Sequence, residues 1–127
     1  MKKNILLLVM LGLLTGISQV ETTPQEALYD TATNIKIAQA KSLLNEGAKA
    51  HINDRFYGGR TILMRAAWGR NLPIIELLVQ EGADVSAVSS DYYHLTPLGW
   101  YMRIMETFRH YGDPYDQKII DLLTPKK

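Results

Sequence analysis

Two sets of apolar residues with helical spacing lie close together in the middle of the chain, within residues 60–86. The first set is Leu63, Met64, Ala66 and Ala67, and the second is Ile74, Ile75, Leu77, Leu78 and Val79. Spacings of one, three and four residues place each set on one side of a helix. Pro73 suits the first turn of the second helix, and Gly82 suits the left-handed position beyond its end. The pattern predicts two short helices joined by a tight turn.

The same pattern recurs along the chain with a constant offset. The sequence LLNEGA at residues 43–48 matches LVQEGA at residues 78–83, an offset of 35 residues. The sequence TIL at residues 61–63 matches TPL at residues 96–98 with the same offset. Two separate anchors that share one offset indicate a repeat architecture in which neighbouring units bury each other's apolar faces.

The central unit resembles an ankyrin repeat. The resemblance rests on TILMRAA at residues 61–67, IIELL at 74–78 and GADV at 82–85. The unit departs from the family signature at Ile62, which replaces Pro, at Met64, which replaces His, and at Arg70, which replaces the Gly between the helices. The resemblance implies an all-α solenoid of helix-turn-helix units with protruding hairpin-like loops. Ankyrin repeats are rarely enzymes, so we expect this protein to bind another protein rather than to catalyse a reaction.

The ankyrin period is about 33 residues, so each connection here carries two extra residues. They fall in the loops that the family projects as fingers. We name residues 50–60 the first finger and residues 85–95 the second finger. Gly58 and Gly59 fit a flexible turn in the first finger, whereas His94 replaces Gly59 in the second.

The N-terminal residues have the layout of a secretory signal. Lys2 and Lys3 precede an apolar run at residues 5–14, which is too short to cross a bilayer. Small residues at Gly16 and Ser18 suggest cleavage before Gln19, although an uncleaved anchor is the alternative. We therefore predict a signal peptide at 1–18 and a flexible N-terminus at 19–23. A bacterial periplasmic or secreted protein follows from this interpretation, and the chain contains no cysteine, so packing alone would hold it together.

The remaining residues, 24–127, are predicted to form one ankyrin-repeat domain in three parts. Residues 24–58 form an N-terminal capping repeat with a helix start at Thr23 and Pro24 and a second helix at 34–44. Residues 59–93 form the central repeat. Residues 94–127 form an atypical C-terminal repeat, with an insertion at 103–117, a first helix lengthened over 102–108, a loop at 111–116 and a second helix at 118–123. The bulky sequence GWYM at residues 99–102 either seals the end of the solenoid or binds a partner.

Motifs for catalysis, cofactors or metals are missing from the sequence. Gly58 and Gly59 lack the spacing and the Lys of a phosphate loop. The three histidines, His51, His94 and His110, stand in separate connections, which does not favour a zinc or catalytic site. The net charge is +1 and falls to about −1 without Lys2 and Lys3, so no nucleic acid or membrane partner is indicated after signal cleavage. We expect no enzyme activity, cofactor or metal, and a chain that is monomeric alone.

The resemblance places the partner-binding surface on the finger tips and the exposed side of each first helix. The candidate residues are Arg55, Phe56, Tyr57, Arg60, Arg65, Trp68, Asp91, Tyr92, Tyr93, Trp100 and Arg103. Tyr, Trp and Arg carry much of the binding energy at protein interfaces, and arginines beside aromatic residues suit an acidic or carboxylate-rich surface. Partial burial against a neighbouring finger is the alternative for Trp68, and burial under its own loop is the alternative for Phe56.

These expectations lead to a specific hypothesis by analogy with small exported bacterial ankyrin proteins. The partner would be another exported or periplasmic protein. The protein would act as an inhibitor or a self-protection protein that caps an exported enzyme such as a cell-wall peptidase. The alternatives are a scaffold for a periplasmic stress-defence enzyme such as catalase, or a secreted host-directed effector.

Overall fold

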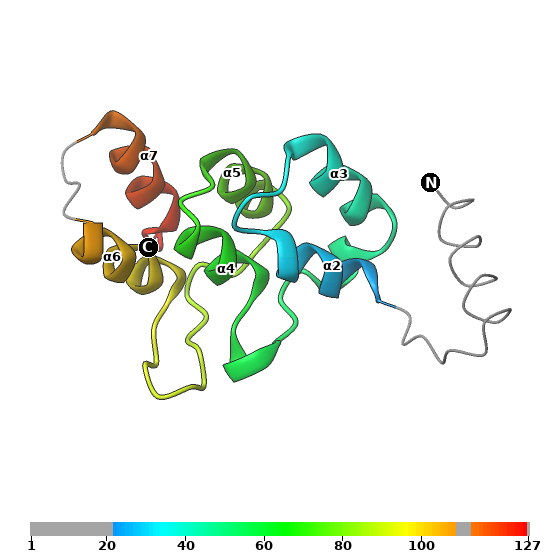
Figure 1. The fold of residues 1–127 in the computed structure, drawn as a ribbon, viewed down its shortest axis with the longest axis horizontal. Coiled ribbons are helices and arrows are strands. Elements are labelled where there is room, and N and C mark those ends of the chain that lie inside the picture. The colour runs from blue at the N-terminus through cyan, green and yellow to red at the C-terminus, as the bar shows by residue number, and fades with distance from the viewer. Residues whose placement is uncertain (1–21, 109–112, 127) are drawn as a thin grey trace, which may run out of the picture.

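The computed structural model describes residues 22–108 and 113–126. Within these residues the chain forms three helix pairs and no strand (Figure 1). The pairs are α2 (Pro24–Thr31) with α3 (Ile37–Asn45), α4 (Ile62–Trp68) with α5 (Leu72–Gln80), and α6 (Pro97–Phe108) with α7 (Pro114–Leu123). Two short 3₁₀ turns, η1 (Ala48–His51) and η2 (Tyr57–Gly59), belong to the connection between α3 and α4. The predicted signal peptide and His110 lie outside the described residues.

The helices form two layers. The first helices of the pairs, α2, α4 and α6, lie side by side, and the second helices, α3, α5 and α7, form a second row above them in Figure 1. Both fingers extend from the row of first helices, on the side away from the second row. This arrangement confirms the predicted all-α ankyrin-repeat solenoid.

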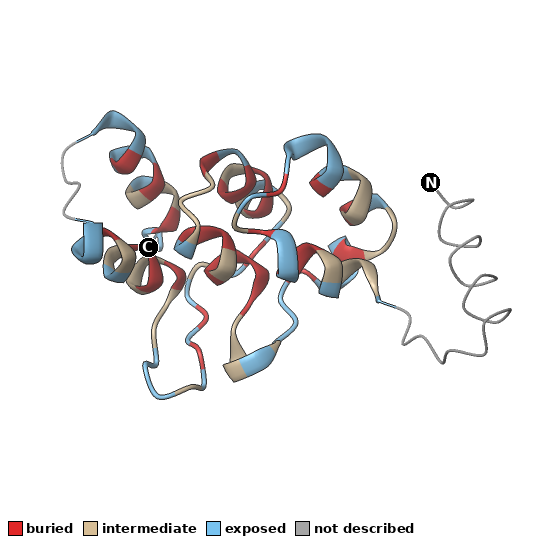
Figure 2. Ribbon diagram, in the orientation of Figure 1, coloured by how far each residue is buried: buried red, intermediate tan, exposed pale blue. Residues whose placement is uncertain are grey.

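The core lies between the two layers and runs through all three pairs (Figure 2). Leu63 and Leu78, which the apolar pattern assigned to the interior, are both buried. The small residues Ala66 and Ala67 are fully buried in α4 and let the neighbouring first helices approach closely. At Gly69 a Cβ atom would lie 2.5 Å from the Cα of Thr33, so only glycine permits this contact between the first two repeats.

Threonine side chains cap two helix starts, of which the cap at Thr23 was predicted from the sequence. The Thr23 side chain accepts a hydrogen bond from the backbone N–H of Glu26 at 3.3 Å, and the Thr61 side chain accepts one from Met64 at 3.3 Å. Beyond the last helical turn of α5, Gly82 has a φ of 96° and occupies the left-handed position expected for it.

The predicted start of α3 at residue 34 is wrong, because that helix begins at Ile37. The backbone N–H groups of Asn34 and Ile35 still bond the Thr31 carbonyl, so these residues complete the turn after α2. The side-chain amide of Asn71 donates to the carbonyls of Ala32 and Ile35 at 3.1 and 3.2 Å, which fixes the connection. A contact from another repeat therefore decides where the helix starts.

The loop predicted at 111–116 is wrong for its last three residues, which belong to α7. Asp113 caps this helix by accepting from the Tyr115 N–H at 2.9 Å, and Pro114 occupies its first turn. The predicted lengthening of the first helix to Phe108 is correct.

A polar network joins the C-terminal repeat to the central one. Arg70 has a φ of 52°, an unusual conformation for a residue with a Cβ atom, and its Nη2 donates to Asp116 Oδ1 at 2.7 Å. The Tyr101 hydroxyl donates to the same oxygen at 2.5 Å, and the Tyr115 hydroxyl donates to the Arg70 carbonyl at 2.7 Å. Burial raises the pKa of Tyr101, and the Asp116 carboxylate raises it further. Tyr101 is thus buried where the C-terminal repeat meets the central one, and the two interpretations of the bulky sequence at 99–102 remain predictions.

Candidate functional site

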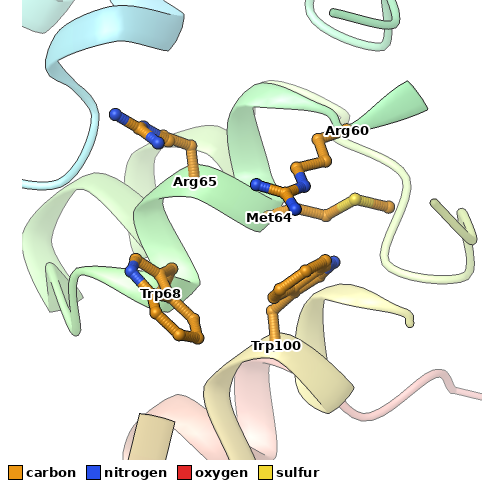
Figure 3. Close-up of a pocket in the computed structure, with 5 residues that line it drawn as sticks. All are labelled: Arg60, Met64, Arg65, Trp68 and Trp100. Atoms are coloured by element: carbon orange, nitrogen blue, oxygen red, sulfur yellow. The ribbon is translucent and has the colours of Figure 1, made fainter. Parts of the chain in front are cut away.

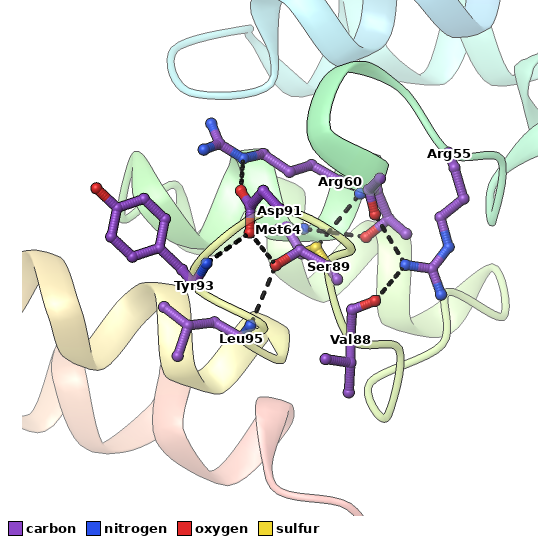
Figure 4. Close-up of polar contacts among 10 residues, drawn as sticks. Arg55, Arg60, Met64, Val88, Ser89, Asp91, Tyr93 and Leu95 are labelled. Carbon is purple, nitrogen blue, oxygen red and sulfur yellow. Dashed lines mark hydrogen bonds and ion pairs between the residues drawn. The ribbon is translucent and has the colours of Figure 1, made fainter.

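A hydrogen-bond network centred on Asp91 orders the second finger and ties it to Arg60 (Figure 4). Arg60 Nε donates to Asp91 Oδ2 at 2.8 Å, and the other carboxylate oxygen accepts from the Ser89 hydroxyl at 2.8 Å and the Tyr93 N–H at 3.2 Å. The Ser89 hydroxyl in turn accepts from the Leu95 N–H at 3.1 Å. Burial raises the pKa of Asp91, but hydrogen bonds from Ser89, Arg60 and Tyr93 outweigh it and hold the pKa below its ordinary value. The Asp91 carboxylate therefore stabilises the conformation of the second finger.

Arg55 and the backbone connect the first finger to the second. Arg55 Nη1 donates to the Gly59 carbonyl at 2.8 Å and to the Val88 carbonyl at 2.6 Å. The Ser90 N–H donates to the Gly58 carbonyl at 3.1 Å. The two fingers are consequently fixed side by side, and a binding partner would not have to order them.

Aromatic rings and arginines alternate where the second finger meets the first helices. The Trp100 ring has Trp68 at one edge, 5.7 Å between centroids, and Tyr93 at another, 5.5 Å away. The Arg60 guanidinium lies 4.4 Å above the Trp100 ring, and the Arg103 guanidinium lies 4.2 Å above the Tyr93 ring. Such cation–π contacts hold the arginines in place while leaving hydrogen-bond donors unused.

A small pocket opens between this cluster and α4 (Figure 3). Arg60, Met64, Arg65, Trp68 and Trp100 line its volume of about 40 Å³. In the close-up, Trp68 and Trp100 form one side of the pocket, and Arg60 and Arg65 stand on the other. The end of the first finger, α4 and α6 thus all contribute to one site.

The structure brings most of the predicted site residues onto one surface. We name this surface the finger face, and it comprises the side chains of Arg55, Tyr57, Arg60, Arg65, Trp68, Tyr92, Tyr93 and Arg103. Tyr57 and Tyr92, at the finger tips, are 86% and 91% exposed, and Trp68 and Tyr93 are 36% and 42% exposed. Trp68 contacts Trp100 of α6 rather than a finger, and it remains accessible.

Three predicted residues occupy a different environment from the one expected. Trp100 is only 5% exposed, because Arg60 covers its ring and Trp68 and Tyr93 flank it, so the expectation of an exposed Trp100 is wrong. Phe56 is half-buried and stacks on Tyr29 of α2 with 4.5 Å between centroids, so its cover comes from a helix of the first repeat and not from its own loop, as the alternative had it. Asp91 is engaged in the internal network described above.

Two contributing residues were missed from the sequence. Tyr29 supports Phe56 and has the Arg65 guanidinium 5.5 Å from its ring centroid, yet nothing local to α2 distinguishes it from an ordinary core residue. Met64 lines the pocket, and its place at the His position of the family signature was the available signal.

The histidines do not gather into a site within the described residues. His51 Nδ1 lies 2.9 Å from Asp54 Oδ2 on the exposed surface, and His94 forms an exposed turn with a φ of 48°. Residues 22–108 and 113–126 contain no group of three or more His, Cys, Asp or Glu side chains placed to hold a metal. Across the same residues no helix has the length and apolar character needed to cross a membrane. The predicted absence of a metal site remains a prediction.

Comparison with known proteins relates the chain to ankyrin repeats. Residues 4–100 match the family model described as Ankyrin repeats (3 copies), and this range includes part of the segment predicted as a signal peptide. A stretch of 63 residues is 36% identical to the transient receptor potential cation channel subfamily V member 1 of Oryctolagus cuniculus. That stretch is 49% of this chain and 8% of the channel subunit, so the similarity concerns a small part of the channel.

Proposed function

Because the chain belongs to the ankyrin-repeat family, whose repeats form protein–protein interaction modules, we propose that its finger face binds another exported protein and covers a functional site on it. The observation that carries this proposal is the set of accessible Tyr, Trp and Arg side chains on two fingers that are already fixed by hydrogen bonds. Side chains of these types bury large areas and still satisfy polar partners, so they provide most of the affinity at many interfaces.

Because hydrogen bonds already fix the conformation of both fingers, even a small surface on them can bind a partner tightly. Arg55 and Asp91 fix the two loops before any partner arrives, so less conformational entropy is lost on association. Tyr57 and Tyr92 lie near the middle of the two fingers and are almost fully exposed, so either ring can enter a recess on the partner. Two rigid, projecting fingers would suit an inhibitor that fills the active-site cleft of an enzyme such as a cell-wall peptidase.

The proposed location outside the cytoplasm rests on the sequence of residues 1–18. Lys2 and Lys3 followed by a short apolar run suit export, and the lack of cysteine is compatible with an oxidising compartment. Cell fractionation with an antibody against the chain tests this step by itself. Recovery of the full-length, uncleaved chain in the cytoplasm would refute it.

The binding proposal is tested by capture from the periplasmic fraction with residues 19–127 as bait. We expect the wild-type chain to recover one dominant protein and the double variant Trp68→Ala/Tyr92→Ala to lose it. The matched control is Gln80→Ala/Gln117→Ala, which changes two exposed residues in the row of second helices and should leave capture unchanged.

The recovered partner also decides between the possible roles. If the chain is an inhibitor, adding it in equimolar amount abolishes the partner's catalytic activity. If that activity rises or stays unchanged, the capping role is wrong. Equal recovery by the wild-type chain and the Trp68→Ala/Tyr92→Ala variant would contradict binding through the finger face.

A further inference from the structure

The side chains that line the pocket described above are hydrogen-bond donors with almost no acceptors among them. Arg60, Arg65, Trp68 and Trp100 offer N–H donors and no acceptor. The sulfur of Met64, the remaining lining residue, already accepts from the Thr61 N–H at 3.4 Å. A group that complements this lining must therefore present acceptors only.

The two arginines of the pocket keep donors available. Asp91 occupies Arg60 through Nε alone, and both oxygens of that carboxylate already accept hydrogen bonds at the finger. Arg65 makes no hydrogen bond or ion pair with any residue in 22–108 or 113–126, and its guanidinium faces the Tyr29 ring. The Trp100 indole N–H likewise has no acceptor among these residues. No hydrogen bond within the described residues uses the terminal nitrogens of either guanidinium, so these are the donors that an acceptor from outside would meet.

The size and shape of the pocket narrow the choice of anion. A volume of about 40 Å³ accommodates roughly three water-sized positions, which matches the three heavy atoms of a carboxylate. A guanidinium pairs with a planar carboxylate through two parallel hydrogen bonds, and the indole rings of Trp68 and Trp100 enclose the pair in apolar surface.

The geometry points to a carboxylate-binding pocket: Arg60 and Arg65 receive one carboxylate of the partner, from an acidic side chain or from a chain end, on the side of the pocket that faces Trp68 and Trp100. This inference rests on the proposed function, because it names the chemical group that the finger face recognises. Tyr57 and Tyr92 at the finger tips then contact the partner around that anchor.

The test uses the two tryptophans of the chain, which both line the pocket. Their indole N–H signals in nitrogen-15-labelled protein report binding directly. Residues 19–127 are titrated with N-acetylglycine, which carries a terminal carboxylate, and with N-acetylglutamic acid α-amide, which carries a side-chain carboxylate. The uncharged controls are N-acetylglycinamide and N-acetylglutamine amide, with ionic strength held constant by sodium chloride.

We expect saturable shifts of both indole signals with at least one carboxylate and none with the amides. The tighter of the two carboxylates identifies the source as a chain end or an internal acidic residue. Arg65→Gln should weaken binding about tenfold, as expected for loss of a charge-assisted bond. Lys41→Gln is the matched control, since it removes one positive charge from an exposed residue of α3, in the row of second helices, and should leave the affinity within about twofold. If Arg65→Gln does not fold, Arg65→Lys replaces it. Lysine keeps the positive charge but cannot form the two parallel hydrogen bonds of a guanidinium, so Arg65→Lys should weaken binding measurably.

Three results would overturn the inference. The first is the absence of a saturable indole shift. The second is an affinity for inorganic phosphate equal to that for either carboxylate at the same ionic strength. The pocket would then recognise negative charge and not the carboxylate group. The third is an equal loss in Arg65→Gln and Lys41→Gln, which would mean that the overall positive charge of the protein, and not the pocket, attracts the carboxylate. If the carboxylates fail while Trp68→Ala/Tyr92→Ala still abolishes protein capture, the pocket inference falls and the proposed function stands.

Discussion

Replacing Asp116 with alanine removes the acceptor that joins the C-terminal repeat to the central one. Asp116 is 2% exposed and accepts from Arg70 and from the Tyr101 hydroxyl on a single oxygen. The substitution leaves a guanidinium and a hydroxyl without this acceptor at the interface of the two repeats. Within the described residues the C-terminal repeat packs on the central repeat through α4 with α6 and α5 with α7, so this interface holds it in place.

The magnitude follows from the burial of the partners. A hydrogen bond to a charged group contributes about 1.5–3 kcal/mol, and removing one partner of a buried ion pair costs about 3–5 kcal/mol. The Arg70 side chain is 33% exposed and regains some hydration when Asp116 is lost, which reduces the loss. We expect Asp116→Ala to lower the free energy of unfolding by about 2–4 kcal/mol, a large share of a typical total of about 5–15 kcal/mol.

Urea titration followed by circular dichroism at pH 7 measures this change. Asp121→Ala is the matched control, because Asp121 lies on the same helix, is exposed and accepts one hydrogen bond from the Gln117 side chain. Its expected effect is below about 0.5 kcal/mol. If the two variants lose the same stability, Asp116 does not join the repeats as described.

Three further predictions concern the core, the finger and alkaline pH. Leu78→Ala should cost about 2–5 kcal/mol in urea titration, because Leu78 is fully buried, and a loss under about 1 kcal/mol would remove it from the core. Gly59→Ala should destabilise the protein more than Gly82→Ala in thermal unfolding: both glycines have positive φ, but only at Gly59 would a Cβ atom meet Ser90, 1.8 Å from its hydroxyl oxygen and 2.8 Å from its backbone nitrogen. Equal losses would mean that φ alone decides. The raised pKa of Tyr101 makes the folded state hold a proton that the unfolded state releases near pH 10, so stability should fall as pH rises above about 10, and less steeply in Tyr101→Phe.

The helices and their order could be predicted from the sequence because their signals are local. The periodic residues around Leu63 and Leu78 determine which side of each helix is buried, and Gly82 determines where the second helix of the central repeat ends. The two helix starts that were predicted wrongly, at residues 34 and 118, depend on other information. Asn71 reaches across to the first repeat, and the capping of α7 by Asp113 lay within what the sequence presented as a loop.

The candidate site was predictable in its residue types and less so in its arrangement. Arginines and aromatic residues at finger and first-helix positions were recognisable from the repeat register. The burial of Trp100 was not, because it results from Arg60 covering its ring from 40 residues earlier in the chain. The pairing of Arg60 with Asp91 also spans two repeats, and a single-sequence pattern carries no signal for such a contact.

Site-specific photo-crosslinking in the cells that make the protein tests the central claim, binding through the finger face, most directly. A photo-reactive phenylalanine analogue is placed at position 68 or 92 on that face, and at position 80 or 117 in the row of second helices. The finger-face account predicts one discrete crosslinked product from positions 68 and 92 and none from positions 80 and 117. A product formed only from positions 80 and 117 would contradict it.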